Sequence, residues 1–252
     1  MKNLHKTSKP RYGLIDTLRG FSLLNMIAYH FCFDIFHVYG LNTGWMYTTT
    51  AVIWERFICF SFIIISGISL NFSGHAYKRG LIVSACGALL TVVTLIAVPG
   101  LAIWFGVLTC IGASMLITQA LRKLLERIHP LAGAAASFLI FAVLYGVPDG
   151  YIGFFKLKLL ELPRFLYQNY FTAFFGFLPA GFVSSDYFPL LPWLFLFIFG
   201  FFVWRAVERY GMEKFFKFSI PPLAFAGRHS LLIYLVHQPV LIGICFLIFG
   251  YF

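Results

Sequence analysis

The residues that could do chemistry in this sequence are ionisable side chains within otherwise apolar stretches. His30 is followed by Asp34 after four residues and by His37 after seven, so a helix would present all three on one face. A carboxylate one helical turn from an imidazole can accept its N–H and raise its basicity. We predict that His30 is a catalytic base and that Asp34 orients it, with a buried packing histidine as the alternative.

A second candidate histidine, His237, precedes Gln238 and Pro239 in the last apolar segment. Proline cannot donate a backbone hydrogen bond, so its neighbours lie beside a freed carbonyl group. An ionisable group inside such a segment costs at least about 2.5 kcal/mol and is a candidate for function by default. We predict a catalytic role for His237, and the sequence does not decide whether it, His30 or His37 is the base.

Three arginines, Arg19, Arg79 and Arg228, are expected near one end of the apolar segments. Arg228 stands just before Ser230 at the start of a predicted helix, where backbone N–H groups and a guanidinium together bind phosphate well. We therefore predict that these arginines bind a phosphorylated ligand, with Ser230 as a fourth contact. For Arg19, an anchoring ion pair with Asp16 is the alternative.

A second set of polar and aromatic residues is expected at the opposite end of the apolar segments. Arg56 needs a carboxylate, a carbonyl or a ligand as its partner if it lies within a span. Asp186 and Tyr187 precede two prolines and Trp193, and a rigid backbone of this kind could form the mouth of a cavity. We predict that all four line a ligand site at this end. A snorkelling anchor for Arg56 and a helix N-cap for Asp186 are the alternatives.

The elements that must position these groups are membrane-spanning helices. Hydrophobic residues make up 60% of the chain and charged residues 11%, whereas a soluble domain is about 25% charged. A span needs about 20 apolar residues. The candidate spans are 13–37, 50–73, 80–98, 104–121, 131–147, 189–205 and 222–250. We predict an all-α polytopic transmembrane bundle of about seven spans.

The distribution of Lys and Arg predicts the orientation. With the N-terminus in the cytosol, most basic residues fall in the inner gaps and only Lys156, Lys158 and Arg164 in the outer ones. A full crossing at 165–183 would place the basic stretch 205–217 outside. We therefore predict that 165–183 is a re-entrant or interfacial outer segment, with an eighth span as the alternative.

Other whole-chain features narrow the class of protein. The net charge is +10, but the charges lie in short clusters between apolar runs, so we expect no nucleic-acid partner. No linker divides the chain, and we predict a single domain over residues 1–252. The five cysteines show no metal-ligand spacing, so we expect no metal.

Five sequence blocks, which cover most of the chain, resemble the catalytic-domain family of heparan-α-glucosaminide N-acetyltransferase. The spacing from Arg19 to His30 is also similar to a motif of acyltransferase family three. The five blocks are RYGLIDTLRGFSLLNMIAYHFCFD at 11–34, FSFIIISGISL at 60–70, FGVLTCIGASMLI at 105–117, SSDYFPLLPWLFLFIFG at 184–200 and LAFAGRHSLLIYLVHQPVLIG at 223–243.

The resemblance implies an acetyltransferase of the cytoplasmic membrane. Acetyl-CoA would be the donor substrate on the cytosolic side, and an amino or hydroxyl group of a sugar or glycan would be the acceptor on the outer side. The residues that would bind this acceptor or stabilise an oxyanion are Arg56, Asp186, Tyr187 and Trp193. Membrane lipid is a further expected partner, and a homodimer is left open. Two alternatives stay open: a transporter or flippase for a small polar or lipid-linked solute, and a non-catalytic membrane scaffold.

Overall fold

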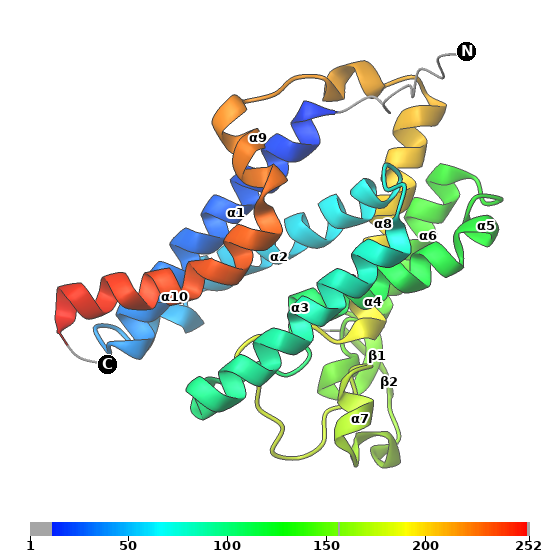
Figure 1. Cartoon of the computed structure of the whole chain (residues 1–252). Coiled ribbons are helices and arrows are strands. Elements are labelled where there is room, and N and C mark those ends of the chain that lie inside the picture. Colours follow the sequence, from blue (N-terminus) through cyan, green and yellow to red (C-terminus); the bar gives the residue numbers. More distant parts are fainter. Residues whose placement is uncertain (1–11, 156, 251–252) are drawn as a thin grey trace.

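The computed structural model describes residues 12–155 and 157–250, and most of them are helical (Figure 1). Within these residues, six helices are long and apolar enough to cross a membrane, and a seventh apolar helix is shorter. The six are Gly13–Val38, Thr49–Leu70, Ala76–Ala97, Pro130–Asp149, Leu190–Arg209 and Ser230–Phe249, and the seventh is Val107–Ala120. The predictions of an all-α polytopic bundle and of an integral membrane protein are confirmed.

The helices follow one another through short connections. In chain order they are α1 (Gly13–Phe33), α2 (Thr49–Leu70), α3 (Ala76–Ala97), α4 (Val107–Ala120), α5 (Arg122–Leu125), α6 (Pro130–Leu144), α7 (Tyr170–Ala173), α8 (Leu190–Arg209), α9 (Pro221–Arg228) and α10 (Ser230–Phe249). Two strands, β1 (Tyr151–Phe154) and β2 (Leu157–Glu161), form an antiparallel hairpin between α6 and α7.

Helix α8 lies at the centre of the bundle. It packs against α2 on one side and against α6 and α4 on the other, while α1 joins α2 to α9 and α10. Its side chains Phe197, Phe201 and Trp204 have no exposed surface. Helices α3 and α10 are less covered than the other spanning helices, with 11% of each spanning window buried, and they contact each other only slightly.

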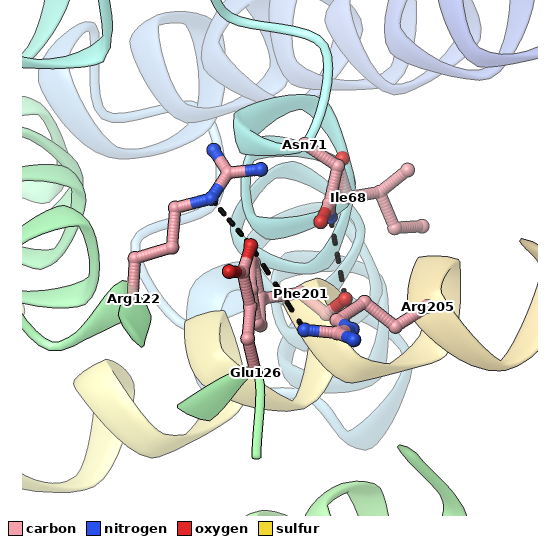
Figure 2. A network of polar contacts seen from close by, with 6 residues as sticks. All are labelled: Ile68, Asn71, Arg122, Glu126, Phe201 and Arg205. Carbon is pink, nitrogen blue, oxygen red and sulfur yellow. Dashed lines mark hydrogen bonds and ion pairs between the residues drawn. The ribbon is translucent and has the colours of Figure 1, made fainter. Parts of the chain in front are cut away.

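Polar contacts tie α2 and the α4–α6 connection to α8 (Figure 2). The side-chain amide of Asn71, which follows α2, donates to the carbonyl oxygen of Phe201 at 3.3 Å. Glu126 Oε1 accepts from Arg122 Nε at 2.8 Å and lies 4.0 Å from Arg205 Nη1. A carboxylate shared by two guanidinium groups stabilises the contact between these elements.

The segment expected as one span over 222–250 is two helices. Helix α9 ends at Arg228 and α10 begins at Ser230, and His229 between them has φ −102° and ψ 16°. Helix α10 then continues through Pro239. The prediction of a single span over this range is therefore wrong, because α9 packs against α1 instead of extending α10.

The segment 165–183 contains only short helical turns, a 3₁₀ turn at Arg164–Tyr167 and α7. No eighth span is therefore formed in the part of the chain that the structure describes. The position of this segment relative to a membrane stays a prediction. The preceding β-hairpin was not expected from the sequence.

Part of the orientation argument lies outside the described residues. Lys2, Lys6, Lys9 and Arg11 precede residue 12, and Lys156 is the one residue omitted within the chain. The side of the membrane on which the N-terminus lies therefore stays a prediction.

Candidate functional site

A cavity of about 290 Å³ lies between α1, α2, α3 and α10 and the loop before α8. We call it the histidine cavity. It is mostly apolar, with polar side chains from several elements on its wall, among them His30, Asp34, Glu55, Asp186 and Gln238. The structure thus brings together three residues of the predicted site, His30, Asp34 and Asp186.

His237 packs directly against His30. The centroids of the two imidazole rings are 4.9 Å apart and the rings are inclined by 62°. His237 Nδ1 lies 2.5 Å from the Tyr234 carbonyl oxygen, and because a carbonyl only accepts, this nitrogen carries the proton. His237 Nε2 is buried without a hydrogen-bond partner among the described residues. In a neutral ring this nitrogen keeps a free lone pair and can accept a proton.

Asp34 is held by Gln238 from α10. Gln238 Nε2 donates to Asp34 Oδ1 at 2.8 Å, and the Asp34 side chain is 1% exposed. The other carboxylate oxygen and the Gln238 amide oxygen are buried without a partner in the described chain. Buried polar atoms normally have partners, so this wall of the cavity is suited to a polar ligand group. The expected hydrogen bond between His30 and Asp34 is not formed; the one side-chain partner of the carboxylate among the described residues is the Gln238 amide.

His37 does not share the face of His30 and Asp34. The helix changes from α to π geometry over Asp34–Val38, and this wider turn rotates the residues that follow. His37 packs against Phe33, with ring centroids 5.0 Å apart, and does not line the histidine cavity. The expectation that all three residues lie on one face is wrong for His37.

At the start of α2, Glu55 and not Arg56 lines the histidine cavity. Arg56 is exposed, and its Nη1 lies 3.8 Å from Glu55 Oε1. The partner that Arg56 was expected to need is thus the carboxylate of the adjacent residue, at the rim of the cavity and not inside it. Long side chains bridge the angle between adjacent helical positions.

Asp186 lines the cavity and also caps a helix. Its Oδ2 accepts the backbone N–H of Val107, the first residue of α4, at 3.0 Å. The pKa of this carboxyl group is raised to about 6. Burial is the main cause, the hydrogen bond from Val107 acts against it, and the nearby Glu55 charge adds to the rise. Asp186 is thus an N-cap supplied by a distant loop, and it fixes the position of α4 against the cavity.

The two aromatic residues of the predicted acceptor set lie away from the cavity. The Tyr187 hydroxyl donates to the Ala173 carbonyl oxygen at 2.6 Å, and burial raises the pKa of this phenol. Trp193 is 4% exposed and packs against Phe60, Phe141 and Phe188 in the core. Of the two, Trp193 supports the cavity wall through its contact with Phe188, which lines the cavity.

A second, larger cavity of about 720 Å³ lies at the other end of α1. We call it the arginine cavity, because Arg19, Arg79 and Arg228 all line it. Arg19 donates to the Ser69 hydroxyl and lies 3.5 Å from Asp16 Oδ1. The three predicted arginines therefore converge from α1, α3 and α9. Ser230 does not line this cavity.

Close packing of α1 against α9 positions two of these arginines. A Cβ atom on Gly20 would lie 1.9 Å from the Leu223 carbonyl oxygen, and one on Gly227 would lie 1.9 Å from the Asp16 carbonyl oxygen. Only glycine permits this approach at either position. Arg19 and Arg228 directly adjoin these two glycines, so the close approach brings them to the same cavity.

The two cavities follow each other along the same helices. Phe62 of α2 lines the histidine cavity and Ser66 lines the arginine cavity, and Val107 and Ile111 have the same relation on α4. Four residues rise about 6 Å along an α-helix. The arrangement suits a ligand that enters at the arginines and reaches the histidines with an extended arm.

The family comparison adds evidence to this geometry. The family model described as heparan-alpha-glucosaminide N-acetyltransferase, catalytic, matches residues 11–239. The chain belongs to this family. It is thus a membrane protein of an acetyltransferase family, which confirms the coarse prediction of an acyltransferase. The matched range contains every lining residue of the arginine cavity, and every lining residue of the histidine cavity except Ile242. Searches of curated proteins and of solved structures gave no match.

No metal centre accompanies the site in the residues that the structure describes. Among residues 12–155 and 157–250, no three His, Cys, Asp or Glu side chains lie close enough together to hold a metal ion. Among the lining residues that sequence reasoning did not select are Gln238, Glu55 and Tyr234. Gln238 had a weak signal, since it is a polar residue beside His237 in an apolar helix.

Proposed function

We propose that this membrane protein transfers the acetyl group of acetyl-CoA, bound in the arginine cavity, to an amino or hydroxyl group of a sugar in the histidine cavity. The family supports acetyl transfer. The observation that carries the two-sided arrangement is the pair of cavities, one turn apart on shared helices and opposite in chemistry. We further propose a single domain in the cytoplasmic membrane with the N-terminus in the cytosol.

The donor would be held by its phosphate groups. Arg19, Arg79 and Arg228 supply guanidinium groups from three helices, and guanidinium binds phosphate in a bidentate manner. Ser230, at the start of α10, is a further proposed contact through its hydroxyl or backbone N–H. The acetyl thioester then lies at the end of the pantetheine arm, directed toward the histidines.

In the chemical step, the acceptor nitrogen or oxygen attacks the carbonyl carbon of the thioester. The imidazole of His30 takes the proton of the attacking group, and the carbonyl oxygen becomes an oxyanion. The carbon–sulfur bond then breaks, and the imidazolium returns the proton to the departing CoA thiolate. The base is thereby regenerated, and no other reactant is required.

The other polar groups of the histidine cavity position the acceptor and the base. His237 packs on His30 and presents Nε2, so it is the second candidate for the proton-accepting group. Asp34 Oδ2 and Gln238 Oε1, both buried without partners among the described residues, would accept hydrogen bonds from the acceptor. Asp186 lines the same cavity and is a further residue proposed to bind the sugar acceptor.

Labelled acetyl transfer tests the proposal. Purified protein in lipid nanodiscs is given acetyl-CoA carrying a labelled acetyl group together with glucosamine, and labelled N-acetylglucosamine is measured. Wild-type protein forms the product, and His30→Ala lowers the rate about 10²-fold or more, the usual contribution of a general base. His37→Ala, on the same helix but outside the cavity, is the matched control and retains activity. Full activity in His30→Ala would contradict the assigned role.

A further inference from the structure

The wall of the histidine cavity is divided by polarity. His30, Asp34 and Gln238 lie together where α1 meets α10. Most of the remaining wall is apolar and is supplied by Val98, Leu101, Ile103, Val107 and Phe188, with Thr94, Ser185 and Asp186 as polar residues among them. Every hydroxyl of a free sugar needs a hydrogen-bond partner when it leaves water. The five apolar side chains offer none, but an aliphatic chain would match them.

Two of the helices that line the histidine cavity, α3 and α10, are the least covered of the six spanning helices in the described residues. Residues of α3 and α10 bound the cavity, and in each of these helices only 11% of the spanning window is buried, compared with 61% in α8. Their outer side chains are strongly exposed: Ile96 is 79% exposed and Leu247 83%. Such apolar surfaces face lipid in a membrane protein.

Only slight contact separates the cavity from lipid on this side. Val98 near the end of α3 and Ile242 of α10 both line the cavity, while α3 and α10 have little contact with each other. The seam between these two helices is therefore the route by which an aliphatic chain lying in the membrane would reach the cavity. The polar head group at the end of such an aliphatic chain would then bind at His30 and Asp34.

We infer that the acceptor is an amino- or hydroxyl-bearing head group on an apolar chain, which enters the histidine cavity sideways from the membrane between α3 and α10. The inference rests on the proposed acetyl transfer and adds the class of acceptor. The head group lies at His30, Asp34 and Gln238, and the chain lies along Val98 and Ile242. The shared chemistry is that of an amphiphile, whether the apolar part is a lipid tail or an aglycone.

Two acceptors that differ only in the length of their aliphatic chain test whether the cavity binds that chain. Acetyl transfer is measured in nanodiscs with methyl and octyl glycosides of glucosamine, and we expect kcat/KM at least tenfold higher for the octyl compound. Val98→Trp fills the cavity and should lower the octyl-to-methyl ratio at least fivefold. Val93→Trp, five positions earlier at an exposed position of α3 that does not line the cavity, should keep the ratio. Because partition into lipid is equal for all variants, it cannot produce this difference. A wild-type ratio near one, or an equal fall in both variants, would overturn the inference.

Photo-crosslinking separates this inference from the proposed function. An octyl glucosaminide with a diazirine in its chain should label the cavity residues around Val98 and Ile242, and Ile242→Trp should reduce the label whereas Leu247→Trp should not. Label found only at the outer surface would overturn the inference. If the probe labels the cavity residues but no acetyl group is transferred to either glycoside, the binding site is supported and the acetyltransferase function is refuted. Equal transfer to both glycosides without cavity label would sustain the enzyme and refute the chain site.

Discussion

The histidine cavity and the arginine cavity are built from the same helices, yet they differ in charge and in polarity. The arginine cavity is the larger and gathers three guanidinium groups. The histidine cavity has no Lys or Arg on its wall among the described residues, and its charged side chains are carboxylates. One end of the bundle is therefore suited to an anionic ligand, and the other to a neutral or cationic group with an apolar neighbour.

This difference explains how one bundle can serve two substrates. A highly charged donor and an apolar acceptor cannot share a single environment, because each would pay for desolvation in the other's site. The separation of about one helical turn keeps the sites apart while leaving their reactive ends within reach. The variants that follow alter one cavity at a time.

The largest expected effect concerns the second histidine. His237→Ala removes the imidazole that packs on His30, and we expect acetyl transfer to fall about 10²-fold or more if Nε2 takes part in proton transfer. His229→Ala, an exposed histidine at the start of the same helix, serves as the control. If His237→Ala binds acetyl-CoA more weakly than wild type in a titration, the claim that the two cavities bind separate substrates would be contradicted.

Arg228→Ala should act on the other cavity. Loss of a charged hydrogen bond costs about 1.5–3 kcal/mol, so KM for acetyl-CoA should rise about tenfold or more while KM for the acceptor stays constant. Arg209→Ala, an exposed arginine at the end of α8 that does not line the cavity, is the matched control. Steady-state kinetics with each substrate varied in turn measures both constants. Equal changes in the two constants would count against separate sites.

Gln238→Leu tests the packing of the histidine cavity. The substitution leaves the buried Asp34 carboxylate without its hydrogen bond, which should lower the free energy of unfolding by about 1–3 kcal/mol. Adding Asp34→Leu should restore part of this loss, because both polar partners are then replaced. Thermal unfolding of the single and double variants gives the coupling. Strict additivity would show that the two side chains do not interact.

The smallest effect concerns Asp186 and pH. Burial raises the pKa of this carboxyl group to about 6 from its ordinary 3.8, so folding favours the protonated form. The stabilising contribution is complete below about pH 4 and is lost as the pH rises through 6. Asp186→Asn keeps an acceptor for the Val107 N–H without a charge. Its melting temperature relative to wild type should therefore rise between pH 4 and pH 7, by the equivalent of about 2 kcal/mol. A constant difference would contradict the raised pKa.

The sequence was a good guide to the spans and to the arginine cavity. The length and apolar composition of a span are properties of the linear sequence, so hydropathy finds the spans. Basic residues mark the ends of apolar segments, so Arg19, Arg79 and Arg228 could be grouped without coordinates. The break between α9 and α10 was harder to see, because it depends on the close approach of Gly227 to α1, a tertiary contact.

The histidine cavity was only partly predictable. His30 and Asp34 were found from their spacing, but the partner of Asp34 comes from α10, more than 200 positions later. The π turn that removes His37 from the cavity leaves no clear signal in the residue types. The choice of Glu55 over Arg56 depends on how far α2 is rotated, which packing fixes and hydropathy does not.

The division of labour between the two cavities is tested most directly by acetyl-CoA affinity in two single variants. The dissociation constant of acetyl-CoA is measured by calorimetric titration of wild type, His30→Ala and Arg228→Ala in the same nanodiscs. We predict that His30→Ala binds acetyl-CoA within about twofold of wild type while it fails to transfer the acetyl group, and that Arg228→Ala binds at least about tenfold more weakly, the loss of a charged hydrogen bond. Unchanged affinity in Arg228→Ala, or a loss of affinity confined to His30→Ala, would contradict the account.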